Sequence, residues 1–124
     1  MESYRQDSLI QLNDQTFSTQ EAKTITQQEK GLSGRACLGE LQAMYFPIEP
    51  QTFACFWMKD MRFSIDIVWF DKDNAIIYLQ KNASPDSYPQ QFCTEKPTKY
   101  VLELPAGTVD KLGLTIGDLA TKKQ

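Results

Sequence analysis

The chain of 124 residues has no histidine, only three cysteines and no CxxC motif. Histidine is the commonest metal ligand and the usual base beside a serine or cysteine nucleophile, so its absence argues against both kinds of site. No apolar run approaches the length of a membrane span. The net charge of −3 argues against a nucleic-acid partner. The sequence therefore indicates no metal, no cofactor and no catalytic residues.

The three cysteines bear on the compartment. An odd number leaves at least one thiol unpaired within the chain. Cys55 lies in an apolar run, where we expect a small buried side chain. Cys37 and Cys93 lie in expected loops and can form a disulfide if the protein is exported. The polar start is not a signal peptide. We therefore expect one of two cases: the protein is cytoplasmic, or it is periplasmic or extracellular and its leader has been removed.

Many short apolar segments separated by turn residues predict one mainly β (α+β) domain, with tails at 1–7 and 121–124 around a domain at 8–120. We expect a barrel-like or strongly curved antiparallel sheet with two short helices. Thr24 and Gln27 form a capping box before the first helix, 25–30, and Gly107 and Gly113 bound the second, 108–112. The expected strands are 8–12, 16–22, 43–48, 53–59, 65–71, 75–80, 100–105 and a closing segment near 117–120.

Prolines mark the expected end of one strand and a long irregular segment. Pro47 and Pro50 are expected to end the third strand. The longest irregular segment, 82–98, contains three prolines, and long loops in compact domains are often functional or mobile.

Residues 53–70 form the densest part of the expected core. This run holds both tryptophans and four of the seven phenylalanines. Trp57 and Trp69 are expected to pack in the core. Both faces of the strand at 65–71 are apolar, so we expect it to be covered on both sides.

Charged residues inside these apolar strands are the candidate site. Asp66 shares a face of its strand with Val68, and Glu103 lies in an apolar setting of its own strand. A buried carboxylate needs a partner, since an unpaired one costs several kcal/mol. Lys59, from the expected strand at 53–59, and Arg35, after a glycine-rich loop, are the best candidate partners, and the N–H groups of that loop, 31–34, are another.

Two interpretations of Arg35, Lys59, Asp66 and Glu103 stay open. As a polar pocket, they bind a small molecule or protein partner, or use Asp66 and Glu103 as the acid and base of a hydrolase or lyase, perhaps one acting on carbohydrate. In the second interpretation, the four residues form internal ion pairs and hold loops in place, and the protein is a structural or accessory domain. The distance between the carboxylates is not given by the sequence, and neither is the oligomeric state.

The order of several motifs resembles the DUF192 family. The motifs are 31–35, 44–46, 56–61, 65–67, 100–107, Gly113 and 117–118. The resemblance implies a compact, mainly β domain of unknown biochemical function, in a family whose members often follow an export leader. The family usually has asparagine where Asp60 stands, proline where Ser64 stands and two cysteines in the long loop, where this chain has only Cys93. The resemblance carries over no catalytic residue.

Overall fold

The computed structural model describes residues 5–123, apart from the side chains of Pro50 and Gln51. The predicted mainly β class is confirmed. The elements are β1 (Ser8–Leu12), β2 (Gln15–Glu21), α1 (Ile25–Lys30), β3 (Gln42–Thr52), β4 (Cys55–Trp57), β5 (Ile65–Phe70), β6 (Ile76–Ala83), the 3₁₀ turn η1 (Pro85–Ser87), β7 (Gln91–Cys93), β8 (Thr98–Pro105), α2 (Thr108–Leu112) and β9 (Ala120–Lys123). No helix among the described residues has the length and hydrophobicity needed to cross a membrane.

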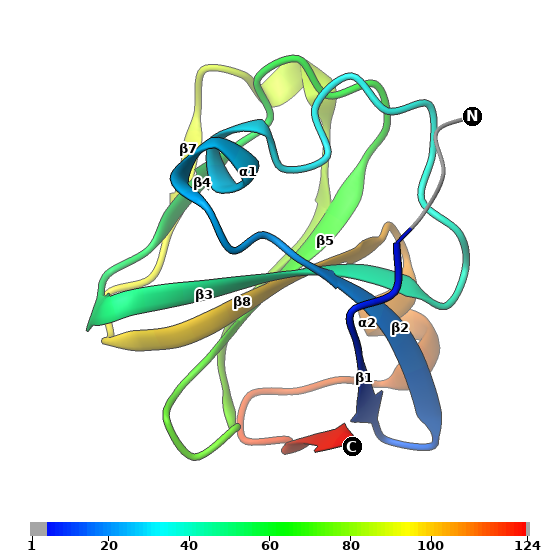
Figure 1. The fold of residues 1–124 in the computed structure, drawn as a ribbon, viewed down its shortest axis with the longest axis vertical. Coiled ribbons are helices and arrows are strands. Elements are labelled where there is room, and N and C mark those ends of the chain that lie inside the picture. Colours follow the sequence, from blue (N-terminus) through cyan, green and yellow to red (C-terminus); the bar gives the residue numbers. More distant parts are fainter. Residues whose placement is uncertain (1–4, 124) are drawn as a thin grey trace.

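Seven strands form one curled sheet in the order β6-β5-β8-β3-β2-β1-β9, and β4 pairs with β7 in a separate ribbon. Neighbouring strands of the seven-stranded sheet are antiparallel, except β2 and β3, which are parallel. The two edges of the sheet approach each other through an isolated bridge between Ala75 and Leu119. The result is a half-barrel with β3 and β8 at its centre (Figure 1).

Both helices have the predicted bounds. The Thr24 side chain accepts a hydrogen bond from the Gln27 N–H, and the Gln27 side chain accepts one from the Thr24 N–H. This capping box satisfies N–H groups that a six-residue helix would otherwise leave free. Gly113 ends α2 in the left-handed conformation, as expected of a residue just past a helix.

The predicted end of the third strand at Pro47 and Pro50 is wrong. β3 continues to Thr52, and its pairing with β8 resumes there after a register shift. The prolines are tolerated because the irregular stretch between Pro47 and Thr52 needs no continuous ladder of N–H donors.

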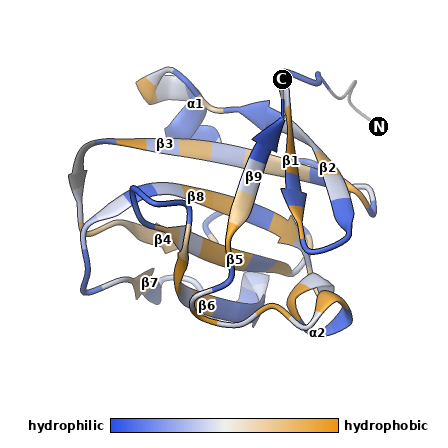
Figure 2. Cartoon of the chain, turned by 90° about the horizontal axis from the view of Figure 1, so that it is seen from below, coloured by the Kyte–Doolittle hydropathy of each residue, from blue (hydrophilic) through white to orange (hydrophobic). Residues whose placement is uncertain are grey.

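The sheet separates two hydrophobic clusters. The α2-side cluster contains Val68, Phe70, Leu102 and Val109. The α1-side cluster contains Leu32, Phe46, Ile67, Trp69 and Val101. All six residues of β5 are buried, which confirms that this strand is covered on both faces. Figure 2 shows hydrophobic residues along β3, β5 and β8, with α1 and α2 on opposite sides of them.

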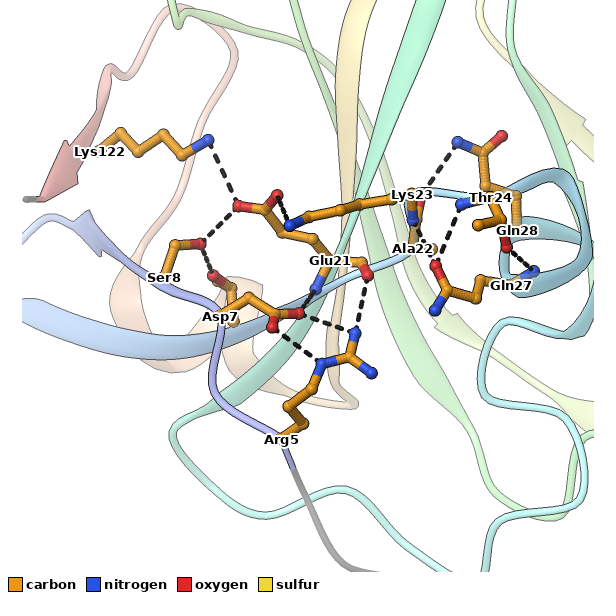
Figure 3. A network of polar contacts seen from close by, with 11 residues as sticks. Arg5, Asp7, Ser8, Glu21, Ala22, Lys23, Thr24, Gln27, Gln28 and Lys122 are labelled. Carbon is orange, nitrogen blue, oxygen red and sulfur yellow. Dashed lines mark hydrogen bonds and ion pairs between the residues drawn. The ribbon is translucent and has the colours of Figure 1, made fainter.

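A polar network joins the start of the described chain to the sheet (Figure 3). Asp7 accepts hydrogen bonds from the Arg5 guanidinium at 2.8 Å and from the Glu21 N–H at 2.7 Å. The Arg5 guanidinium holds the pKa of the Asp7 carboxyl below its usual range. The Glu21 carboxylate accepts from the Ser8 hydroxyl at 2.9 Å and lies 3.5 Å from Lys122 Nζ. Residues 1–4 of the predicted tail lie outside the described residues.

Candidate functional site

Asp66 lies on the α2 side of the sheet and is fully satisfied there. Its side chain is inaccessible to solvent. One carboxylate oxygen accepts from the Asn82 N–H and the other from the Val109 N–H, each at 2.8 Å. Asn82 lies where the pairing of β5 with β6 shifts register, and Val109 lies in the first turn of α2. Asp66 therefore fastens an irregular strand and a short helix to β5.

Glu103 lies on the other face. In β8 it stands opposite Ile67 of β5 and Met44 of β3, both of which belong to the α1-side cluster. Asp66 stands opposite Leu104, which belongs to the α2-side cluster. Paired residues of antiparallel strands point to the same face, so the two carboxylates point in opposite directions.

The Glu103 side chain is buried without a partner among the described residues. It is 5% exposed, and its Oε1 atom receives no hydrogen bond. Burial raises the pKa of the Glu103 carboxyl to about 8. A neutral carboxyl group is the cheaper state here because ionisation would place an uncompensated charge in an apolar setting. Glu103 is therefore largely protonated near pH 7.

The backbone of Gly31, which follows α1, lies against Glu103. A Cβ atom at this position would lie 3.8 Å from Glu103 Oε1 and 3.4 Å from Phe46 Cζ. Gly31 has a φ of 50° and a ψ of −127°, a conformation that glycine adopts without strain. Its N–H donates to the Gln27 carbonyl at 2.8 Å and is therefore not free to bind Glu103.

A cavity of about 390 Å³ opens between α1, the segment after it, β3 and β4. Its volume falls in the range of small-molecule sites. Glu103 and Gly31 contribute to its lining, and most of the other lining residues are apolar or aromatic, including Leu32, Phe46, Ile48, Phe56, Trp57 and Met61. A buried carboxyl group with an unpaired oxygen thus forms part of the wall of an open cavity.

Lys59 lies beside this cavity, in the turn after β4. It borders a neighbouring hollow of about 460 Å³ that shares Lys30, Ser33 and Trp57 with the cavity. Its Nζ atom is 5.7 Å from the centre of the Trp57 ring. The Ser33 hydroxyl donates to the Lys59 carbonyl at 2.8 Å, which holds the turn against the segment after α1.

Arg35 is half-buried and borders a third, smaller hollow of about 190 Å³, which shares Lys30 and Gly31 with the cavity. The structure therefore brings three of the four predicted residues, Arg35, Lys59 and Glu103, around the Lys30 and Gly31 positions. It does not bring Asp66 there.

The sequence did not predict that aromatic side chains beside the cavity are exposed. Trp57, predicted to pack in the core, is 42% exposed, whereas Trp69 is fully buried as expected. The Trp57 ring contacts that of Tyr88, with centroids 5.2 Å apart. Ile25 and Phe53 are also exposed, at 78% and 60%. The alternation Cys55, Phe56, Trp57 was a possible signal, because it places Trp57 on the face opposite Phe56.

The expected burial of Cys55 is wrong, and Cys93 pairs with Cys55 rather than with Cys37, whereas the expectation of an unpaired thiol is confirmed. Cys55 is exposed rather than buried, and it is disulfide-bonded to Cys93. Cys37 is exposed and free. The reason is the pairing of β4 with β7, which places Cys55 directly opposite Cys93. The disulfide ties the segment that contains β7 to a strand that lines the cavity.

The half-barrel fold of this domain is similar to that of two solved structures. One is a protein of unknown function from Novosphingobium aromaticivorans DSM 12444, with 28% identity, a TM-score of 0.86 and coverage of 91% of this chain and 83% of that one. The other, from Sinorhizobium meliloti 1021, is described provisionally as a transcription regulator. It has 28% identity, a TM-score of 0.88 and coverage of 98% and 97%.

The chain belongs to the DUF192 family (uncharacterized ACR, COG1430), which it matches over residues 8–121. The resemblance seen in the sequence is therefore confirmed. No curated protein shows significant similarity to the chain.

Proposed function

We propose that this protein is a small ligand-binding domain whose site is the α1-side cavity, with Glu103 at its base. One observation carries the proposal: Glu103 Oε1 is buried and unpaired among the described residues, at the wall of an open cavity. A buried polar atom without a partner costs about 1–3 kcal/mol. A ligand that donates a hydrogen bond to it removes that cost on binding.

The four predicted residues take different roles in this proposal. Glu103 contacts the ligand. Lys59 and Arg35 border hollows that adjoin the cavity and set the charge around its mouth. Asp66 supports the fold from the opposite face through its bonds to Asn82 and Val109.

A purely structural or accessory role is the main alternative. A carboxyl group kept for structure is expected to find donors, as Asp66 does. Glu103 gains no such bond from the described residues, which favours a binding role.

A hydrolase or lyase that uses Asp66 and Glu103 together is disfavoured by the opposite directions of their side chains. A general acid and base must both reach the reacting atoms.

The provisional description of the Sinorhizobium relative suggests transcription regulation. A ligand-binding domain is compatible with a sensing role, but the net charge of −3 gives no electrostatic support for direct contact with DNA. We further propose that the protein works in an oxidising compartment, because the Cys55–Cys93 disulfide would persist there.

A thermal-shift panel of metabolites and glycans tests the proposed function. A ligand at 100 times its Kd stabilises a protein by about 2.7 kcal/mol. We expect at least one compound to raise the Tm of the wild type and of Asp110→Asn, an exposed control, but not of Glu103→Gln. If no compound raises the Tm of the wild type, or if every shift persists in Glu103→Gln and Trp57→Ala, the proposed site is wrong.

A further inference from the structure

Glu103, in the cavity lining, has an oxygen atom without a hydrogen-bond partner among the described residues, and two of the polar side chains nearby are already engaged. The Gln28 amide donates to the carbonyls of Ala22 and Pro47, at 3.0 and 3.1 Å. The Ser33 hydroxyl donates to the Lys59 carbonyl. A ligand that brings its own N–H or O–H group can satisfy this oxygen atom.

The cavity wall next to this acceptor is aromatic. Phe46 and Phe56 contact each other edge to face, with centroids 5.1 Å apart, and Trp57 follows on β4. Aromatic rings attract cations through their negative faces. The protein already places an ammonium group near one of these rings, since Lys59 Nζ lies 5.7 Å from the Trp57 centroid. The wall therefore accommodates positive charge as well as apolar groups.

We infer that the ligand is a small primary amine with an apolar body, whose ammonium group pairs with the Glu103 carboxylate. This inference rests on the proposed function. The ammonium donates to Oε1, and the apolar body lies against the aromatic wall. An alcohol can supply a donor but no compensating charge. A carboxylate ligand would place a second acid beside Glu103.

The binding step conserves charge. The free protein holds Glu103 as a neutral carboxyl group, and the amine arrives as its ammonium form. On binding, the Glu103 O–H bond breaks, its proton passes to solvent, and the carboxylate that remains accepts a hydrogen bond from the ammonium. Amine affinity should rise by up to about tenfold per pH unit as pH rises toward 8 and level off above it.

Other charged groups lie around Glu103. Glu29 and Lys30 of α1 line the same cavity. Arg35, from the segment after α1, and Lys59, from the turn after β4, border the adjoining hollows. The residues opposite Glu103 on β3 and β5, Met44 and Ile67, do not titrate. Lys30 is exposed and is the cation of the cavity lining that can compete with the ligand.

Matched amines and alcohols test this inference by isothermal titration calorimetry at pH 7. The probes are phenethylamine with 2-phenylethanol, and hexylamine with 1-hexanol. We expect at least one amine to bind at least tenfold more tightly than its alcohol. Titrations in buffers of different ionisation enthalpy should show release of nearly one proton per amine bound.

Variants separate the inference from the proposed function. Glu103→Gln should remove the preference for the amine while retaining any binding of the alcohol, and Glu103→Met provides a second variant should the first fold poorly. Lys30→Met should bind the amine at least as tightly as the wild type. Equal binding of amine and alcohol, no binding of either amine, or amine binding unchanged in Glu103→Gln overturns the inference. The proposed function fails separately, if the wider metabolite panel is negative or if every thermal shift persists in Glu103→Gln and Trp57→Ala.

Discussion

Asp66 and Glu103 are two buried carboxyl groups on adjacent strands of one sheet, yet their surroundings are opposite. Asp66 accepts two backbone N–H bonds at 2.8 Å and joins β5 to β6 and α2. Glu103 receives no bond at Oε1 from the described residues and borders an open cavity. Burial alone therefore does not distinguish a structural acid from a candidate ligand-binding one. What distinguishes them is whether the protein supplies the donors.

The largest expected effect is the pH dependence that Glu103 imposes on stability. Its pKa is raised from 4.5 to about 8 by burial, so the folded protein holds a proton that the unfolded chain releases in this range. Stability is therefore lost as pH rises from about 4.5 to 8. The loss should be on the order of 5 kcal/mol relative to Glu103→Gln, which has no such group.

Urea denaturation of the wild type and Glu103→Gln from pH 4 to 9 measures this difference. Other titrating groups are common to both proteins and cancel. Two parallel stability curves would show that Glu103 ionises normally in the folded state.

The disulfide beside the cavity gives the next effect. The double variant Cys55→Ser with Cys93→Ser should lose about 4 kcal/mol, because the bond closes a loop with a sequence separation of 38. Hydrogen exchange should speed up first in β4 and β7, while the Val109 amide held by Asp66 stays protected. Cys37→Ser, at an exposed free thiol, is the control and should change stability by less than about 0.5 kcal/mol. Equal loss of protection at Val109 and β7 would contradict the separation of the two sides.

Asp66→Asn tests the satisfied side of the comparison. The amide turns one acceptor into a donor that faces a buried N–H, so we expect a loss of about 2–3 kcal/mol at neutral pH. Asp110→Asn is the matched control, since its ion pair with Lys81 is exposed and is worth less than about 1 kcal/mol. Chemical denaturation of both variants makes the measurement. Equal stabilities would mean that Asp66 does not clamp β6 and α2.

The local fold was predictable where short-range chemistry determines it. The capping box at Thr24 and the glycines at 107 and 113 were enough to place both helices. The two-faced apolar pattern of residues 65–70 predicted a strand covered on both sides. The β7 strand was not predictable, because its three residues are held by pairing with a distant segment that brings Cys93 to Cys55.

The candidate site was predictable in part for a similar reason. Alternation within each strand identified Asp66 and Glu103 as buried acids. It does not give the register between strands, and a shift of one residue reverses the face of every side chain. The observed register pairs Asp66 with Leu104 and Ile67 with Glu103, which separates the acids. Trp57 was wrongly predicted to lie in the core. Its apolar neighbours gave no indication that it ends a short strand of three residues.

The pKa of Glu103 is the most direct test of the account, and a carbon-13 NMR titration of its side-chain carboxyl carbon measures it. Glu103→Gln identifies the resonance. We expect a midpoint near pH 8 in the free protein, and a shift of the resonance toward its ionised position when a binding amine is added at pH 7. A midpoint near the ordinary value of 4.5 would contradict it, because Glu103 would then already be charged and satisfied without a ligand.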